Sequence, residues 1–127
     1  MTVAQAKELA ANFLRGDNNN AQISNDTVLL AIHEIAIRCE PLHLVKEYTG
    51  SETDVFRKIL STTDDDKELY IREPVIDDNS EVDIDKDLQM AAVFFICAYL
   101  SNKNKEYYEA KAEKLIAIYK TNHLNMA

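Results

Sequence analysis

The stretch that decides the fold is MAAVFFICAYL, residues 90–100, which is an unbroken apolar run. It follows the acidic stretch VDIDKD, residues 82–87, and it precedes a charged, tyrosine-rich segment that ends at residues 119–120. A helix that is apolar on every side must be covered on every side, by its own fold or by neighbouring copies of the chain. The run is too short to cross a bilayer. We therefore predict a buried helix with core positions at Leu88, Ala92, Phe95 and Ile96.

Length and composition favour one compact helical domain. The chain has 127 residues, 46% of them hydrophobic, with only two glycines and two prolines. This length is close to the commonest domain size, so we expect a single domain over residues 1–127. Few glycines and prolines argue against a linker or a many-turned β-sandwich. The predicted fold class is all-α, a small helical bundle with an extended arm or short β-hairpin inserted before the last two helices.

Apolar residues at helical spacing predict further helices at 2–15, 27–40 and 105–120, and shorter ones at 42–49 and 55–60. In the helix at 27–40, Leu29, Leu30 and Ile37 are expected to widen the apolar face. The arm is placed at about 68–84, where apolar residues alternate and Pro74 interrupts them. Because proline cannot pair in a central strand, we expect an extended arm or an edge hairpin there, with little role in the core.

The net charge of −8 is concentrated in one region of the chain. Residues 64–87 hold eleven acidic and three basic side chains, so the rest of the chain is neutral. Binding to nucleic acid requires a basic surface that displaces counterions from the phosphates. Direct binding to DNA or RNA is therefore not expected, and the acidic region is interpreted as a solvated face.

No set of residues in the sequence forms a catalytic or metal-binding motif. Cys39 and Cys97 lie in separate apolar stretches and are predicted to be buried free thiols. His33, His43 and His123 are too far apart in sequence to make a ligand pair, and we interpret them as surface or packing residues. The acidic stretches lack the glycine and the final glutamate of an EF-hand loop. We expect no enzyme activity, no metal and no cofactor.

Tyrosine is the residue type that most suggests a binding surface. A tyrosine buries a large ring and keeps a hydroxyl for a partner, which suits a subunit interface, but such rings also cap the edges of ordinary cores. Both interpretations stay open for each ring in the last two helices. The interface candidates, taken from the arm and from these helices, are Tyr70, Arg72, Pro74, Tyr99, Tyr107, Tyr108 and Tyr119.

Three blocks of sequence resemble a known family. They are LYIREP at 69–74, DIDKDL at 83–88 leading into AAVFFICAYL at 91–100, and YYEAKA at 107–112 leading into IAIY at 116–119. In order and spacing they resemble the extended arm and paired C-terminal helices of tailed-phage head-to-tail connector proteins, also called adaptor or head-completion proteins. The resemblance covers about the last 50 residues, and none of its blocks is a catalytic signature.

The resemblance implies a virion protein, assembled in the host cytoplasm, that forms a ring between the portal and the tail. Its partners would be portal and tail proteins and further copies of itself, in a ring of about twelve subunits by family resemblance. The arm would reach a neighbour or the tail, DNA would pass nearby without being specifically bound, and no membrane would be involved. The alternative is a small cytosolic helical interaction module or regulator. A ring would favour the connector, and a stable monomer or dimer with an unrelated partner would favour the module.

Overall fold

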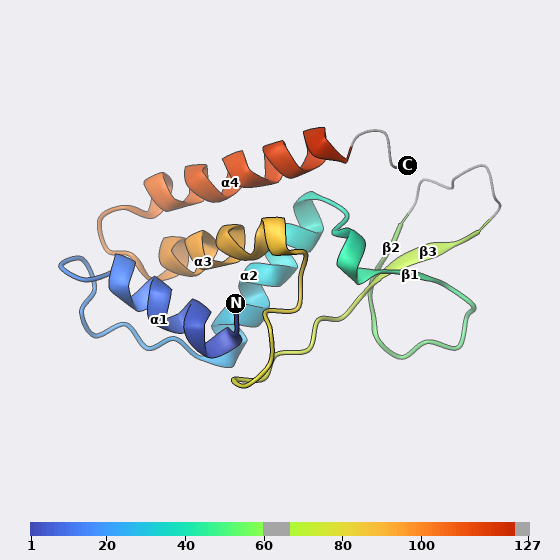
Figure 1. Ribbon diagram of the computed structural model, residues 1–127, viewed down its shortest axis with the longest axis horizontal. Helices are drawn as coiled ribbons and strands as arrows, with labels where there is room; N and C mark the ends of the chain where they lie inside the picture. The colour runs from blue at the N-terminus through green and yellow to red at the C-terminus, as the bar shows by residue number, and fades with distance from the viewer. Residues whose placement is uncertain (60–66, 124–127) are drawn as a thin grey trace.

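The computed structural model describes residues 1–59 and 67–123 and shows a helical body with a small sheet at one end (Figure 1). The sheet makes the fold mixed α and β, so the all-α prediction is confirmed only for the helical bundle. The helices are α1 (Val3–Phe13), α2 (Asn25–Arg38), α3 (Lys86–Leu100) and α4 (Lys105–Asn122), with a 3-10 helix at Leu42–Leu44. The strands are β1 (Val45–Glu47), β2 (Val55–Ile59) and β3 (Leu69–Arg72).

The first two helices begin at residues whose side chains bind the free amides of the first turn. The Thr2 hydroxyl accepts a hydrogen bond from the Gln5 amide, and the Gln5 side chain accepts one from the Thr2 amide, which completes a capping box. Ser24 caps α2 through the Thr27 amide. After α1, Gly16 adopts a positive φ of 81°, a conformation that glycine takes without steric cost. The bounds of α1 and α2 agree with the helices predicted at 2–15 and 27–40 to within two residues at each end.

The apolar helix α3 is the centre of the body. It packs against α1, α2 and α4, and most of its contacts are with α4 (Figure 1). Leu88, Ala92, Phe95 and Ile96 are each at most 2% exposed. The fold of a single chain therefore buries these four side chains, and neighbouring copies are not needed for their burial.

The sheet replaces two helices that the sequence patterns predicted. The helix predicted at 42–49 is wrong, because only Leu42–Leu44 form a turn of 3-10 helix before β1 begins. The helix predicted at 55–60 is also wrong, since Val55–Ile59 form β2; Leu60 lies outside the described residues. β1 and β2 both pair antiparallel to β3, which gives the order β1-β3-β2.

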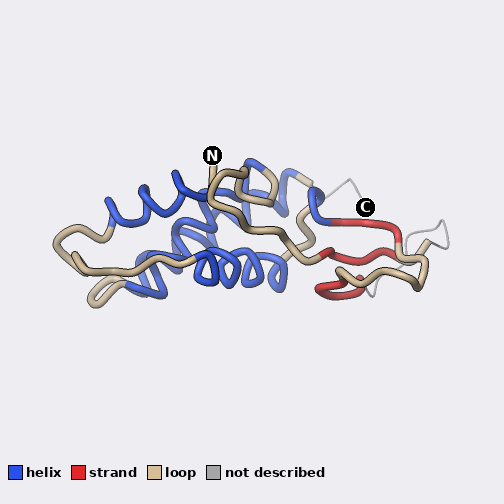
Figure 2. Tube along the Cα trace, turned by 90° about the horizontal axis from the view of Figure 1, so that it is seen from below, coloured by secondary structure: helices blue, strands red, loops and turns tan. Residues whose placement is uncertain are grey.

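The predicted arm is part of the core of one chain, contrary to expectation. Its first part, β3, is the central strand of the sheet, and Pro74 lies after the strand, where it removes no ladder hydrogen bond. Its last part returns to the helices, where Val82 and Ile84 are only 2% and 3% exposed. The sheet itself lies beyond the helices along the long axis of the molecule (Figure 2). The sheet projects, but its strands and the return segment are held by intramolecular contacts.

Candidate functional site

The sheet is joined to the helices by a group of polar side chains that we call the polar junction. Arg72, at the end of β3, donates two hydrogen bonds to Asp83, with Nη1 to Oδ2 at 2.6 Å and Nη2 to Oδ1 at 2.8 Å. The Asp83 carboxylate also accepts from the Val75 amide and lies 2.9 Å from the His43 ring nitrogen Nε2. The side chains of Arg72 and Asp83 are 18% and 16% exposed. This bidentate, mostly buried pair fixes the orientation of the sheet end against the segment that enters α3.

Asp85 extends the polar junction to α4. Asp85 precedes α3 but its side chain makes no capping hydrogen bond. Its carboxylate instead accepts from the His43 amide at 2.9 Å and from the Tyr119 hydroxyl at 2.8 Å. That hydroxyl in turn accepts from the Leu42 amide at 2.9 Å. The polar junction therefore links the strand end, the 3-10 helix, the start of α3 and the last turn of α4. The side chains that make it are those of Arg72, Asp83, His43, Asp85 and Tyr119.

The polar junction predicts an acid-labile contribution to stability. Burial alone would raise the pKa of Asp83, but the hydrogen bonds from Arg72, from the Val75 amide and from His43 outweigh it and hold the pKa at about 2. An unfolded aspartate has a pKa of about 3.9, so the contribution is fully present above that value and is lost as the pH falls towards 2. Because the carboxylate keeps some contact with water, we expect about 1–2 kcal/mol.

Urea unfolding of the wild type and of Asp83→Asn, measured from pH 7 to pH 2, checks this expectation. The stability difference between the two proteins should shrink between about pH 4 and pH 2, because in that range the unfolded wild-type chain takes up a proton at Asp83 that the folded chain does not. A difference that stays constant over that range would show that Asp83 does not titrate in this way.

A second set of contacts fixes the other side of the sheet to α2. The Arg57 side chain donates to the carbonyl oxygens of Ala36 at 2.8 Å and Cys39 at 3.0 Å, at the C-terminal end of α2. The His33 ring stacks on Phe56 with centroids 4.4 Å apart, and His33 also pairs with Glu73. The sheet is thus attached to α2 as well as to α3 and α4, and it projects as a fixed element.

Five of the seven predicted interface residues lie inside one chain. Tyr70 and Tyr108 are 4% and 7% exposed, and their hydroxyls donate to Asp54 Oδ1 and to the Phe13 carbonyl. Tyr119, Arg72 and Pro74 are likewise buried or engaged at the polar junction. The hydroxyls of the three tyrosines and the guanidinium of Arg72 thus have hydrogen-bond partners within the chain, and Pro74 is buried. Tyr99 and Tyr107, at 38% and 57% exposed, remain on the surface.

The structure exposes other large apolar side chains, two of which the sequence patterns placed in the core. Leu30 and Ile37 of α2 are 58% and 62% exposed, so they do not widen its buried face as predicted. They are seven residues apart, about two turns, and lie opposite Val28 and Ile35. Ile118 of α4 is 48% exposed. The helical spacing already indicates that Leu30 and Ile37 lie on the exposed face of α2. The sequence analysis instead interpreted them as part of a broad apolar stripe that faces the core.

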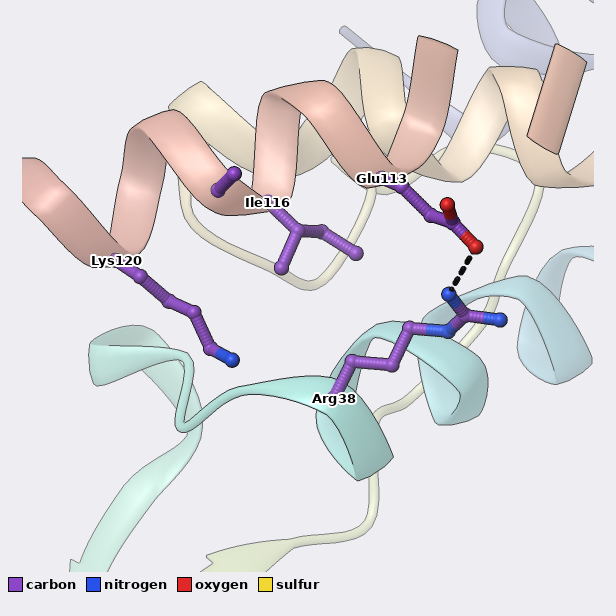
Figure 3. Close-up of a pocket in the computed structure, with 5 residues that line it drawn as sticks. Arg38, Glu113, Ile116 and Lys120 are labelled. Carbon is purple, nitrogen blue, oxygen red and sulfur yellow. Dashed lines mark hydrogen bonds and ion pairs between the residues drawn. The ribbon is translucent and has the colours of Figure 1, made fainter. Parts of the chain in front are cut away.

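A groove lies between the C-terminal part of α2 and α4 (Figure 3). It is lined by Arg38, Glu113, Ile116, Ala117 and Lys120. The guanidinium of Arg38 donates to Glu113 at 2.7 Å across the groove, as the dashed line in Figure 3 shows. The lining side chains are a guanidinium, a carboxylate, an ammonium group and two aliphatic groups, and the guanidinium is already paired with the carboxylate.

The reactive side chains of the described residues are dispersed or buried. Burial raises the pKa of the Cys39 thiol to about 11 and that of Cys97 to about 12, so both thiols are protonated at neutral pH. Residues 1–59 and 67–123 contain no group of three or more His, Cys, Asp or Glu side chains placed to hold a metal ion. Within the same ranges, no helix combines the length and apolar character needed to span a membrane.

Comparison with protein-family models, with curated proteins and with solved structures finds no match to this chain.

Proposed function

We propose that this protein is a virion structural protein, a head-to-tail connector that forms a ring between the portal and the tail of a tailed phage. The proposal rests on the three connector-like blocks of sequence and on the elements that they form. The first block covers β3, the second enters and forms α3, and the third forms most of α4. These elements contact one another in the fold, since α3 packs on α4 and the polar junction ties β3 to both.

The observation that carries the proposal is the sheet that projects from the helical body (Figures 1 and 2). A connector subunit must reach neighbouring molecules with a part whose position is fixed, because every copy in a ring makes the same contacts. Arg72 and Arg57 anchor the sheet to the body on two sides. The projecting part is therefore a preorganised contact element, and its edge strands β1 and β2 are suited to bind a portal or tail segment.

The negative net charge of the chain is compatible with a ring through which DNA passes. A net charge of −8 disfavours adhesion to the phosphate backbone, so DNA would move through the ring without specific binding. We propose no cofactor and no reaction for this protein, and its role is mechanical.

The test is complementation of phage particles that lack the gene. We expect mutant lysates to contain DNA-filled heads and separate tails, and addition of the purified protein to restore tailed particles. Electron microscopy should then show a ring of added density below the portal. A matched variant, Arg57→Met, removes the anchor of the sheet on α2 and should reduce the yield of tailed particles several-fold, because the projecting element is held less firmly.

Two outcomes would contradict the connector proposal. If tailed, infectious particles form at wild-type yield without the protein, it is not a connector. Stable association of a monomer or dimer with an unrelated cellular protein would favour the alternative, an interaction module.

A further inference from the structure

Four aromatic rings form one cluster on the side of the helical body where α3 runs between α1 and α4 (Figure 1). They belong to Phe13 of α1, Phe94 of α3, and Tyr107 and Tyr108 of α4. The centroid of the Phe94 ring lies 5.5 Å from that of Phe13 and 6.4 Å from that of Tyr108, and the Tyr107 and Tyr108 centroids are 5.3 Å apart. Tyr108 is buried, Phe94 is half-buried, and Phe13 and Tyr107 are exposed. Three of the four rings therefore present apolar surface to the solvent.

The cluster continues along α4 as a row of exposed side chains. Tyr107, Lys111, Lys114 and Ile118 follow one another at intervals of four, three and four residues, so they share one side of the helix. The row is about 16 Å long, or three turns. The Lys111 ammonium lies 5.5 Å from the centroid of the Phe94 ring and 5.1 Å from that of Tyr107, which joins the row to the cluster. We call the four rings and this row together the aromatic face.

The row on α4 carries two positive charges and no negative one. At about 100° per residue, every carboxylate of α4 lies at least about 110° from the row around the helix axis. These carboxylates are Glu106, Glu109 and Glu113. Within residues 1–59 and 67–123, no ion pair joins Lys111 or Lys114 to a carboxylate. The two ammonium groups are therefore free to pair with a carboxylate from another molecule.

The other two helices add one carboxylate to this side of the body. Asp87 lies seven residues before Phe94, about two turns, so it shares that side of α3, and its carboxylate is 3.7 Å from the His123 ring. Glu8, the acidic residue of α1, is five residues from Phe13, about 140° around the helix, and lies on another side. Two ammonium groups and one carboxylate leave the aromatic face with a net positive charge, in a chain whose net charge is −8.

We propose that the aromatic face binds an amphipathic helix of another protein, one whose apolar side chains are flanked by carboxylates. A row of exposed side chains three turns long has the spacing at which one helix packs against another. Aromatic rings are enriched at the centres of protein interfaces, and the two lysines complement a negatively charged partner. A nucleic acid is a poorer partner, because two lysines displace few counterions from the phosphates. The inference does not rest on the connector role, which is carried by the sheet.

Site-specific photocrosslinking tests this inference. The photoreactive residue p-benzoylphenylalanine is incorporated in place of Ile118, in the cells where the protein is made together with its natural partners. After irradiation, mass spectrometry identifies the crosslinked peptide. We expect a helical peptide of another protein that carries at least two carboxylates. Lys111→Glu with Lys114→Glu should lower the crosslink yield several-fold, because like charges then repel, and replacing the carboxylates of that peptide by lysine should restore it.

The matched control is Lys105→Glu with Lys120→Glu. It makes the same change in net charge about 150° away around α4 and should leave the crosslink yield unchanged. The photoreactive residue at Val75, which is exposed and outside the aromatic face, gives the background yield. Thermal melting must show that each variant keeps the wild-type fold.

Three results would overturn the inference. They are a yield at position 118 no higher than at position 75, a crosslink to a second copy of this chain or to nucleic acid, and equal losses of yield in the two double variants. Because the sheet is unchanged in all of these variants, each result leaves the connector proposal to the complementation test.

Discussion

Replacing Ile96 by Asp is expected to unfold the protein at room temperature. Ile96 lies in α3 with none of its surface exposed, and α3 packs against the other three helices. An aspartate there must either lose its hydration as a charge or be protonated, and either costs several kcal/mol. Domains of this size are stable by only about 5–15 kcal/mol, so a loss of this size is as large as the whole stability at the lower end of that range, and the folded state is no longer favoured. Loss of the helical circular dichroism signal at 25 °C is the measurement.

Two further aspartate variants separate burial from the mere presence of a charge. Ala110→Asp, on the exposed face of α4, should change stability by less than about 0.5 kcal/mol. Phe95→Asp should fall between the two, because the Arg38 guanidinium lies 5.0 Å from the centre of the ring and can neutralise the new carboxylate. Equal melting temperatures for Ile96→Asp and the wild type would contradict the assignment of α3 as the core.

Replacing Arg72 by Met is expected to destabilise the protein by about 2 kcal/mol, between the effect of an exposed ion pair and that of a fully buried one. The change leaves the Asp83 carboxylate without its bidentate donor, although the Val75 amide and His43 remain. Urea unfolding of Arg72→Met, Asp83→Asn and the double variant gives the coupling energy. We expect the double variant to be more stable than the sum of the two single losses predicts, because each single change already breaks the pair.

The ion pair between Lys7 and Asp78 provides the control. Its two charged atoms are 2.8 Å apart, as close as those of the Arg72 pair, but the Asp78 side chain is 60% exposed. Lys7→Met should therefore have a much smaller effect than Arg72→Met, since solvent screens the pair. A loss in Arg72→Met no larger than that in Lys7→Met would show that the polar junction does not fix the sheet.

The helices were predictable from the sequence because their signals are local. Thr2, Ser24 and Gly16 mark helix ends through contacts with residues within three or four positions, and the apolar run of α3 follows from composition alone. The sheet was not predictable in this way. β1 has three residues and β2 has five, too few for period 2 to be told from period 3.6, and both depend on pairing with β3 further along the chain.

In the candidate site, too, residue types could be predicted from the sequence, but contacts between distant residues could not. Arg72 and Tyr119 were singled out by residue type, but their partners Asp83 and Asp85 lie 11 and 34 residues away. No local pattern indicates that an arginine will find a carboxylate within its own chain rather than in a neighbour. Exposure of Leu30 and Ile37 was in principle predictable, since their angular position on α2 opposes that of Val28 and Ile35.

The order of the strands in the sheet also sets the order of events during synthesis. The central strand β3 is the last of the three to leave the ribosome, and β1 and β2 each pair only with it. At about 5–20 residues per second, β2 therefore waits on the order of one second for its only partner. During that interval both strands present unpaired edges, and α3, which forms the core, has not yet been made. Slowing translation between Ile59 and Leu69 lengthens this interval, so we expect codon usage there to affect aggregation more than the same change after α3.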